Sequence, residues 1–414
     1  MFTMTRVKCI LRQSCVSWSD KITDCIHGAV MKTITGTHNS AKVYTDNLEP
    51  SAAAQIQAIV DCEVFAGSNI CIMPDVHAGI GCTIGMTMTF TDRIVPNFVG
   101  VDIGCGMLTL NLGKIEIDLP RFDSQVKRSV PSGFHIRNNC HPFVKNTGIN
   151  KLICPDVTLA RARDSVGTLG GGNHFIELAK DDDGDVYLVI HSGSRNMGKQ
   201  IAEYYQKIAV SKCPDVKKDF AFVKGKDYDG YLHDMQIAQE YADWNRRAIA
   251  DSIISNYFYS SDSGDDSNQK QLNEYQQFTT IHNYLDCENK ILRKGAISAY
   301  KDETVLIPMN MRDGSLICKG LGNKEWNYSA PHGAGRILGR GAAMKALNLS
   351  DFQKSMQGIY TTTANESTLD EAPMAYKPME EIINNIGDTV SIMKHIKPVY
   401  NFKAGEGGGR RRRR

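Results

Sequence analysis

The stretch "GVDIGCGM" at residues 100–107 places a carboxylate and a thiol in a loop with almost no other side chains. Glycine allows the backbone to bend sharply or to approach a ligand closely. A lone cysteine in such a turn is usually a small buried hydrophobe, which is the plain interpretation of Cys105. Aspartate and thiolate are also metal ligands, and a thiolate can bridge two ions. Asp102 and Cys105 therefore raise the hypothesis of a metal site.

Histidines in polar, glycine-flanked contexts supply further candidate ligands. Five of the eleven histidines lie in such contexts: His77 ("PDVHAGIG"), His174 ("GGGNHF"), His191 ("IHSGSR"), His282 ("IHNY") and His332 ("PHGAGR"). A single histidine of this kind is more often a hydrogen-bonded structural residue. An aspartate, a cysteine and three histidines together form a mixed ligand set suited to Mn, Fe, Co or Zn, among which the residues do not decide.

The run "HGAGRILGR" at residues 332–340 is a second constellation, and it has neither Walker nor GxGxxG spacing. If a helix begins near Gly333, then His332, Arg336 and Arg340 share one face. The free N–H groups of a helix N-terminus and two arginines would bind phosphate, and the histidine could contact or attack it. The alternative is a glycine-capped surface helix with solvated arginines. Other cations in glycine-containing motifs are Arg195 ("HSGSR"), Arg293 and Lys294 ("RKGA").

A predicted hairpin would position two of the histidines. Apolar runs at 173–178 and 186–195 flank the Asp/Gly-rich turn "AKDDDGD". If the turn centres between Asp182 and Asp183, His174 lies opposite His191, with Cβ atoms about 4.5–5.5 Å apart. A slip of one residue would send one histidine to the other face of the sheet.

Patterns in the rest of the sequence predict one long helix and one exposed loop. Apolar residues recur at helical spacing through residues 230–257, and the polar stretch 259–270 ("YSSDSGDDSNQK") is typical of a surface loop. The two halves of the candidate site lie more than 200 residues apart in the sequence. We therefore expect one large domain with a composite cleft.

Composition places the chain among soluble globular proteins. Of 414 residues, 42% are hydrophobic and 23% charged, and no apolar run approaches the ~18 residues that cross a bilayer. The net charge is +2, but without the five arginines at 410–414 the counts are 43 basic and 46 acidic residues, a charge of −3. A polyanion site must then be a local cluster. The twelve cysteines form no CxxC pair, which favours reduced thiols in a cytoplasmic protein.

The two ends of the chain are expected to lie outside the catalytic domain. Residues 1–30 are predicted to be a nonessential extension, because Asp20 and Asp24 argue against a transit peptide. Residues 406–414, rich in glycine and arginine, are predicted to be a disordered tail that could attract RNA by charge alone.

Six motifs occur in the order of a known family. They are "MPDVHAGIGCTIG", "VGVDIGCGM", "GTLGGGNHFIEL", "VIHSGSRNMG", "HGAGR" and "EAPMAYKP". Over roughly residues 31–405 the chain resembles the RtcB-type RNA ligases, which depend on GTP and manganese and act in tRNA splicing and RNA repair. The resemblance implies an α+β fold with a single large catalytic domain at 31–405, in which mixed sheets are surrounded by helices.

The resemblance also implies a reaction. Such ligases join an RNA end carrying a 2′,3′-cyclic phosphate or a 3′-phosphate to a 5′-hydroxyl end. A histidine forms a covalent bond to GMP from GTP, GMP is moved onto the RNA 3′-phosphate, and the 5′-hydroxyl displaces it. A cyclic phosphate is first opened to a 3′-phosphate. Neutral histidine is a competent nucleophile toward phosphorus, and metal ions neutralise phosphate charge.

The motifs assign roles to residues of this chain. By resemblance, His332 is the guanylylated nucleophile, and Cys105 bridges two Mn²⁺ ions whose ligands are Asp102, Cys105, His174, His191 and His282. Nucleotide-contacting positions are Asn173, Phe175, Glu177, Asn310, Ser315, Gly333, Ala334, Gly335 and Lys403, with Glu177 and Lys403 on the guanine. Phosphate or RNA contacts fall on Arg195, Arg336 and Arg340.

One segment departs from the family pattern. Where many members have a stretch like "IPGSMGTASY", this chain has "IPMNMRDGSL" at residues 307–316. Asn310 replaces a serine that helps to hold the nucleotide, whereas Ser315 keeps the later one. Arg312 and Asp313 add charge near the expected pocket, which bears on nucleotide preference.

Three functions are compatible with these residues in different degrees. The first is an RNA ligase, with RNA as partner, an Archease-type activator as a further possible partner, no membrane association and a monomeric state. The second is a metal-dependent phosphoesterase or end-modifying (3′-capping) enzyme that uses the same metals without resealing. The third is a nucleic-acid-binding module without catalysis, which would not need Asp102, Cys105 and three histidines. The "HGAGR" histidine with a guanine-side glutamate and lysine favours the ligase.

Overall fold

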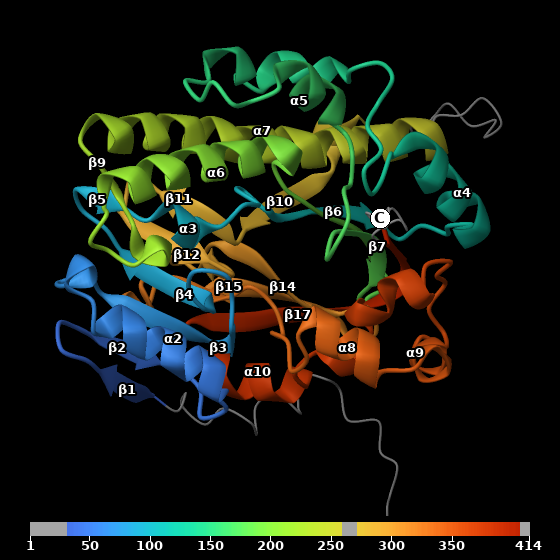
Figure 1. Ribbon diagram of the computed structural model, residues 1–414. Coiled ribbons are helices and arrows are strands. Elements are labelled where there is room, and N and C mark those ends of the chain that lie inside the picture. Colours follow the sequence, from blue (N-terminus) through green and yellow to red (C-terminus); the bar gives the residue numbers. More distant parts are fainter. Residues whose placement is uncertain (1–30, 259–270, 406–414) are drawn as a thin grey trace, which may run out of the picture.

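The computed structural model describes residues 31–258 and 271–405. Predictions for residues 1–30, 259–270 and 406–414 lie outside the described residues. Within these ranges the chain is an α+β protein in which sheets lie between layers of helices (Figure 1). The predicted fold class is confirmed.

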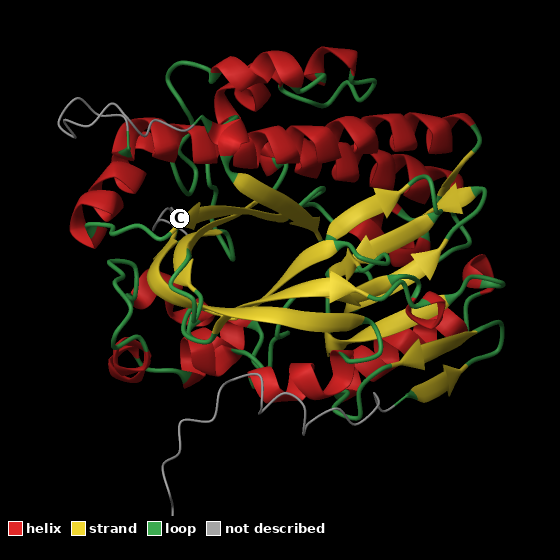
Figure 2. Ribbon diagram, turned by 180° about the vertical axis from the view of Figure 1, so that it is seen from behind, coloured by secondary structure: helices red, strands yellow, loops and turns green. Residues whose placement is uncertain are grey.

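Seven strands form an antiparallel sheet in the order β10-β6-β8-β7-β17-β15-β14. Their bounds are β6 (Gly106–Gly113), β7 (Phe175–Lys180), β8 (Val186–Ser192), β10 (Gln276–Ile281), β14 (Thr304–Asn310), β15 (Gly314–Gly320) and β17 (Val390–Lys403). The sheet curls, as Figure 2 shows. Its edge strands β10 and β14 meet, where the Thr280 hydroxyl accepts a hydrogen bond from the Leu306 amide at 3.0 Å.

The other large sheet has six strands in the order β1-β2-β3-β4-β12-β11. They are β1 (Lys32–Thr35), β2 (Ser40–Val43), β3 (Ile70–His77), β4 (Ile84–Thr89), β11 (Asn283–Asp286) and β12 (Ile291–Lys294). Only β2 and β3 pair in parallel among the described strands, so this sheet is mixed. Two small sheets pair β5 (Arg93–Ile94) with β9 (Val223–Lys224), and β13 (Ala296–Ser298) with β16 (Ser329–Pro331).

Helices cover the sheets on two sides. On one side α7 (Lys226–Tyr257) packs beside α6 (Arg195–Lys212), and α2 (Pro50–Val60) and α10 (Met379–Ile386) lie on the opposite side (Figure 1). The remaining helices are α3 (Pro96–Val99), α4 (Leu119–Ser129), α5 (Leu159–Ser165), α8 (Arg340–Ala346) and α9 (Leu349–Ser355). No helix among the described residues is long and apolar enough to cross a bilayer.

Helix α7 confirms the predicted long helix, whose apolar residues are buried. It contacts β6 and β8 of the curled sheet and β11 of the mixed sheet. The two sheets therefore share one covering helix, and their cores belong to one domain.

Alternation along the strands explains which side chains enter the curl. In β8, Val186, Leu188 and Ile190 pack toward α7, whereas Tyr187 and Val189 pack inside the curled sheet. Both faces are covered, so the strand is apolar throughout, as expected for a strand buried on both sides. The same alternation directs His191 to the inside of the curl.

The predicted hairpin forms, but its register is one residue away from the predicted one. Phe175, not His174, pairs with His191, and every pair down to Lys180 and Val186 keeps this register. The turn is held by backbone hydrogen bonds from Gly184 to Asp181 and from Asp181 to Asp185, both 3.1 Å. His174 precedes the strand, so strand alternation does not fix the direction of its side chain.

Candidate active site

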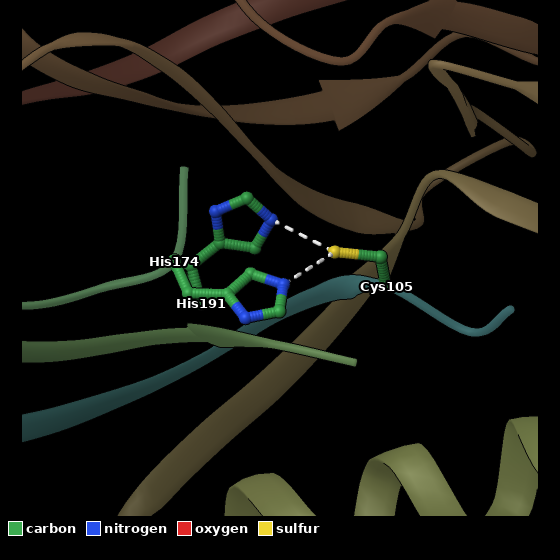
Figure 3. A group of neighbouring side chains, drawn as sticks. All are labelled: Cys105, His174 and His191. Atoms are coloured by element: carbon green, nitrogen blue, oxygen red, sulfur yellow. Dashed lines mark hydrogen bonds between the residues drawn. The ribbon is translucent and has the colours of Figure 1, made fainter. Parts of the chain in front are cut away.

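Cys105, His174 and His191 form a buried cluster at one end of the curled sheet (Figure 3). The Cys105 Sγ atom lies 3.4 Å from His174 Nε2 and 3.2 Å from His191 Nε2. Cys105 immediately precedes β6 and His191 lies near the end of the neighbouring β8. Strands paired side by side thus bring these ligand atoms together from positions 86 residues apart.

Asp102 and His282 extend the cluster at its two ends. Asp102 Oδ2 lies 2.9 Å from His174 Nε2, and His282 Nε2 lies 3.0 Å from His191 Nε2. The five predicted ligands therefore form a continuous row, Asp102–His174–Cys105–His191–His282. The structure thus brings together the five residues that the sequence analysis proposed as ligands.

The donor set fits a cation. The His174 Nδ1–H group donates to the Leu169 carbonyl at 2.8 Å, so Nε2 carries the lone pair, which faces the Asp102 carboxylate. Two lone pairs at this distance repel unless a proton or a cation lies between them. Imidazole, thiolate and carboxylate together suit a divalent transition metal. The row can therefore hold metal ions.

Electrostatics act on these groups in different directions. Burial raises the pKa of the Asp102 carboxyl, but a proton held between His174 Nε2 and Asp102, together with the charge of Arg195, outweighs burial and lowers this pKa to about 2. Burial holds the pKa of His191 and of His282 well below the ordinary value, so both rings are neutral. Burial and the adjacent Asp102 raise the pKa of the Cys105 thiol well above its ordinary value, so a metal that binds the thiolate displaces a proton.

The glycines beside Cys105 lie where a larger side chain would clash with neighbouring elements. Gly104 has φ +69°, and a Cβ there would lie 3.0 Å from the Gln239 Cα atom on α7. A Cβ on Gly106 would lie 2.3 Å from the Thr280 carbonyl oxygen on β10. The loop can thus fit between α7 and β10 only with glycine at both positions.

Two buried polar residues of α7 hold the loops of the cluster in place. Arg246 donates to the carbonyls of Gly104 at 2.7 Å and Ser192 at 3.0 Å. Asn245 donates to the Gly193 carbonyl at 3.1 Å and accepts from the Gly167 amide at 2.8 Å. The helix therefore positions the Cys105 loop relative to the end of β8.

His332 lies beyond His282, with ring centroids 4.9 Å apart. Its Nδ1–H group donates to Asp75 Oδ2 at 2.6 Å, and its backbone N–H donates to the same oxygen at 3.1 Å. Asp75 is fully buried at the end of β3. Because Nδ1 carries the proton, Nε2 is the nitrogen available to a phosphate.

The predicted helix at Gly333 is wrong. Residues 332–339 form a loop after β16, and α8 begins only at Arg340. Gly335 has φ +74°, and a Cβ there would lie 2.2 Å from the Asp75 carbonyl oxygen. The glycine allows this loop to pack closely against β3. No helix begins at His332, so the expected helix N-terminus is not there.

A pocket opens beside His332, at the end of the curled sheet. Its lining includes all of the predicted nucleotide positions, namely Asn173, Phe175, Glu177, Asn310, Ser315, Gly333, Ala334, Gly335 and Lys403. His191, His282, Arg336 and Arg340 line the same pocket. Two of the five row residues, His191 and His282, therefore share a cavity with the predicted nucleotide positions.

The floor of this pocket carries buried polar atoms without partners. Glu177 Oε2 accepts from Asn401 Nδ2 at 2.8 Å, whereas Glu177 Oε1, Asn401 Oδ1 and Ser315 Oγ have no partner among the described residues. Burial raises the pKa of the Glu177 carboxyl to about 8. Unpaired buried polar atoms are costly, which favours a polar ligand at this position.

One buried carboxylate organises the cations of the pocket. Glu371 accepts from Lys403 Nζ at 2.7 Å, from Arg336 at 3.1 Å and from the Tyr376 hydroxyl at 2.6 Å. Arg340 lies 3.1 Å from Asp370 and 3.4 Å from Glu371. Burial alone would raise the pKa of Glu371, but Lys403, Arg340 and Arg336 hold it well below its usual range. The network fixes three cations at the pocket wall.

The variant segment forms the turn between β14 and β15. Asn310 Oδ1 accepts from the backbone amides of Arg312 at 3.0 Å and Asp313 at 2.9 Å, and its Nδ2 donates to Asp313. Arg312 and Asp313 form an ion pair at 2.7 Å, so their charges offset each other. The Asn310 side chain is thus engaged in the turn, whereas Ser315 Oγ remains available.

Two predicted cations lie elsewhere. Arg293 is fully buried away from the pocket, with contacts to Ser329, Tyr284 and Asp286, so it is a core residue. Arg195 does not line the nucleotide pocket but a second cavity beside Asp102 and His174. Its guanidinium donates to the Thr168 hydroxyl and to the Gly133 carbonyl.

Sequence reasoning missed Asp75, Glu371 and Asn401. Asp75 lies in "MPDVHAGIG" two residues before His77, and its polar side chain inside an apolar strand was the available signal. Glu371 begins the quoted motif "EAPMAYKP". Asn401 is two residues from Lys403, on the same face of β17, which strand alternation could have revealed.

Comparisons with known proteins agree with this site. A family model described as tRNA-splicing ligase RtcB matches residues 55–154 and 144–404. The chain is 29% identical over 405 residues to RNA-splicing ligase RtcB of Escherichia coli (strain K12), covering 89% of this chain and 98% of that protein. It is 27% identical to tRNA-splicing ligase RtcB of Pyrobaculum aerophilum, with 75% and 82% covered. It is 26% identical to RNA-splicing ligase RtcB2 of Escherichia coli (strain ATCC 25922), with 80% and 86% covered.

The fold and site thus define an α+β enzyme with a buried cluster that could hold a metal ion and with a pocket that His332 lines. The chain belongs to the RtcB family, a class of ligases that join RNA ends. The resemblance stated from the six motifs is confirmed.

Proposed function

We propose that this protein joins an RNA end carrying a 2′,3′-cyclic phosphate or a 3′-phosphate to a 5′-hydroxyl RNA end, in tRNA splicing or RNA repair. GTP is consumed as the second substrate. The observation that carries the proposal is the 2.6 Å contact between His332 Nδ1 and the buried Asp75, because His332 lines the pocket that also contains His191, His282 and the predicted nucleotide positions.

His332 would attack the α-phosphorus of GTP through Nε2. The new N–P bond forms as the bond to pyrophosphate breaks. The attack leaves positive charge on the imidazole ring, and the Asp75 carboxylate accepting from Nδ1–H stabilises that charge. An oxygen of the RNA 3′-phosphate would then take GMP from His332, and the 5′-hydroxyl oxygen would displace GMP from the RNA.

The pocket floor would recognise guanine. The N1–H and N2–H groups of guanine are donors, and Glu177 Oε1 and Asn401 Oδ1 are buried acceptors to which no described residue donates. Lys403 and Ser315 are donors for the guanine carbonyl. Phe175 would pack against the base, with Asn173, Asn310 and the backbone of Gly333, Ala334 and Gly335 around the nucleotide.

Metal ions held by the row of five ligands would balance the negative charge of the phosphates. Asp102, Cys105, His174, His191 and His282 would hold two Mn²⁺ ions, with the Cys105 thiolate as bridging ligand, and bound ions would supply positive charge against the phosphates. Arg336 and Arg340 would contact phosphate oxygens of the nucleotide, and Arg195 those of the RNA. The remaining parts of the proposal are a monomeric cytoplasmic enzyme and turnover assisted by an Archease-type activator.

Covalent labelling tests the proposal. The protein is incubated with Mn²⁺ and α-³²P-GTP, denatured, and examined for acid-labile label, beside a His332→Ala variant. We expect manganese-dependent label on the wild type and none on the variant. An unlabelled wild type with manganese bound would contradict the proposal and favour the phosphoesterase or end-modifying alternative.

A further inference from the structure

Asp75 lies in a part of β3 that the sheet itself does not hold. β3 pairs with β2 and with β4 from Ile70 to Ile72, and it meets β4 again only at His77. Between these points, residues 73–76 have no ladder partner among the described strands, and Pro74 has no backbone N–H with which to form one. The direction of the Asp75 side chain, and through it that of His332, therefore depends on other contacts.

The buried side chain of Lys377 supplies one of these contacts. Its Nζ atom donates to the Pro74 carbonyl at 2.9 Å, and the residue is only 4% exposed. The Pro74 carbonyl and the Asp75 N–H belong to one planar peptide unit, so a fixed carbonyl fixes the direction in which the chain enters the Asp75 Cα atom. On the other side of that atom, the Asp75 carbonyl accepts from His77 Nδ1 at 3.0 Å. The two peptide units around Asp75 are thus held by two side chains.

The backbone of Lys377 holds the loop that carries His332. Its N–H group donates to the carbonyl of Gly335, three residues after His332, at 3.1 Å. Asp75 and His332 are the two partners of the 2.6 Å contact on which the proposed function depends. Lys377 joins both, because its side chain holds the strand of Asp75 and its backbone holds the loop of His332.

Glu381 on α10 and Asn47 complete the surroundings of the ammonium group. Glu381 Oε1 lies 3.2 Å from Lys377 Nζ, and Asn47 Nδ2 donates to the two carboxylate oxygens of Glu381 at 3.0 and 3.1 Å. A buried ion pair is weak evidence for stability, because removing two charges from water costs about as much as their attraction contributes. An apolar side chain could fill the same space without that cost. The ammonium is therefore better explained by the position in which it holds the Pro74 carbonyl.

We infer that Lys377 is a positioning residue for the guanylylation of His332 and acts through Asp75. The inference rests on the proposed function, in which His332 Nε2 bonds to the α-phosphorus of GTP as pyrophosphate leaves. Without the ammonium the Pro74 carbonyl loses its donor, the Asp75 carboxylate is no longer held in one place, and the His332 ring is oriented less accurately. Lys377 does not line the nucleotide pocket, so guanine binding does not depend on it.

Lys377→Met, which keeps most of the side-chain length but has no donor, tests the inference. The rate of label incorporation from α-³²P-GTP, measured on the full chain with Mn²⁺ at saturating GTP, should fall about 10- to 100-fold, as when a residue that orients an active group is lost. The affinity for GMP, which has no pyrophosphate to lose and binds without reacting, should stay unchanged in titration calorimetry. Lys394→Met removes a lysine that is paired with Asp181 and lines neither cavity, so it should alter neither quantity.

A second variant covers the case in which Lys377→Met does not fold, as thermal unfolding would show. Lys377→Gln keeps a hydrogen-bonding group in the buried site, but its amide nitrogen ends one bond short of the ammonium position. It should slow guanylylation over the same range and leave GMP affinity unchanged.

A double variant shows whether Lys377 acts through Asp75. Lys377→Met/Asp75→Asn should be about as slow as Asp75→Asn alone, because no orienting carboxylate is left to misplace, whereas independent effects would multiply. Multiplied effects, a wild-type rate in the folded Lys377 variants, or a loss of GMP affinity as large as the loss of rate would overturn the inference. A labelled wild type beside fully active Lys377 variants contradicts this inference alone, whereas an unlabelled wild type contradicts the proposed function and this inference with it.

Discussion

Asp75 is a single buried residue that orients His332, the proposed nucleophile. Both of its contacts to His332 involve the same oxygen, Oδ2, so the carboxylate fixes the ring and the backbone that carries it. This arrangement has the logic of an aspartate that orients a catalytic histidine. Asp75 is thus a positioning residue for His332.

Asp75→Asn should slow guanylylation of His332 by about 10²- to 10⁴-fold, the range set by loss of an orienting carboxylate. The amide keeps the shape of the side chain but not the charge that stabilises the imidazolium. The measurement is the rate of label incorporation from α-³²P-GTP, with circular dichroism to verify the fold. Glu49→Gln, which keeps an acceptor for the Ala78 amide near the same strand, is the control. A wild-type rate in Asp75→Asn would contradict the assigned role.

Glu177 should make GTP binding depend on pH. Its pKa of about 8 means that the empty pocket holds a protonated carboxyl at neutral pH, whereas guanine donors require the carboxylate. GTP affinity should therefore rise by up to about tenfold per pH unit below 8 and level off above it. Titration calorimetry in buffers of different ionisation enthalpy should detect the released proton. Glu177→Gln should bind more weakly and without this dependence, and a persistent pH slope would refute the mechanism.

The same pKa has a consequence for folding. A raised pKa means that the folded chain holds the proton more tightly than the unfolded chain, whose carboxyl has an ordinary value of 4.5. The contribution of Glu177 to the free energy of unfolding therefore declines as pH rises from about 4.5 to about 8. Urea denaturation between these pH limits measures the free energy of unfolding of the wild type and of Glu177→Gln. The loss of stability with rising pH in the wild type, relative to the variant, should grow across this range.

At the scale of elements, α7 joins the pieces of the metal row. Arg246 and Arg247 are neighbours on this helix, and both lie near Asp243. Only Arg246 reaches the carbonyls that flank Cys105 and His191, whereas Arg247 contacts Gln277 and is 27% exposed. The pair offers a matched comparison on one helix.

Arg246→Met should weaken Mn²⁺ binding about 10- to 100-fold, as loss of a residue that orients metal ligands does. Arg247→Met should leave the affinity nearly unchanged. Calorimetric titration of the metal-free protein with MnCl₂ measures both, with thermal unfolding as a check that each variant is folded. Equal affinities for the two variants would show that α7 does not position the ligands.

Local sequence patterns predicted which helices and strands form better than they predicted strand register and tertiary packing. Helix α7 was evident because its apolar spacing extends over many turns, and the β7–β8 hairpin because two apolar runs flank an Asp/Gly turn. The register failed by one residue, because three aspartates in succession offer several turn centres of similar quality. The helix at Gly333 failed for another reason: the glycines that resemble a helix start are there to approach Asp75 on β3.

At the scale of the whole molecule, the site depends on the curl of the seven-stranded sheet. Phe175, Glu177, His191, Ser315 and Lys403 come from four strands, and the curl directs them into one cavity. Strand alternation predicts only that alternate residues share a face. Which strand faces enclose a common cavity depends on tertiary pairing. Motifs could therefore name the candidate metal ligands, whereas the contacts of Asp75 and Glu371 and the second cavity follow only from the tertiary structure.

The distribution of charge over the molecule sets the last prediction. Apart from residues 410–414, acidic residues outnumber basic ones by three, so the cations of the two cavities are local features of a mildly acidic protein. The five arginines at 410–414 add a separate cationic segment. Counterion release makes any such contribution to RNA affinity strongest at low salt and small at high salt.

Deletion of residues 410–414 should therefore weaken RNA binding at about 50 mM salt and reduce the salt slope, but leave the ligation rate at saturating RNA unchanged. In the proposed reaction the chemistry depends on His332 and on the five proposed metal ligands, none of which the deletion removes. The comparison needs single-turnover ligation at saturating RNA together with binding measured at several salt concentrations. A lowered saturating rate would mean that the arginines act in the reaction itself. In that case charge beyond the two cavities would have to reach the RNA ends during strand joining.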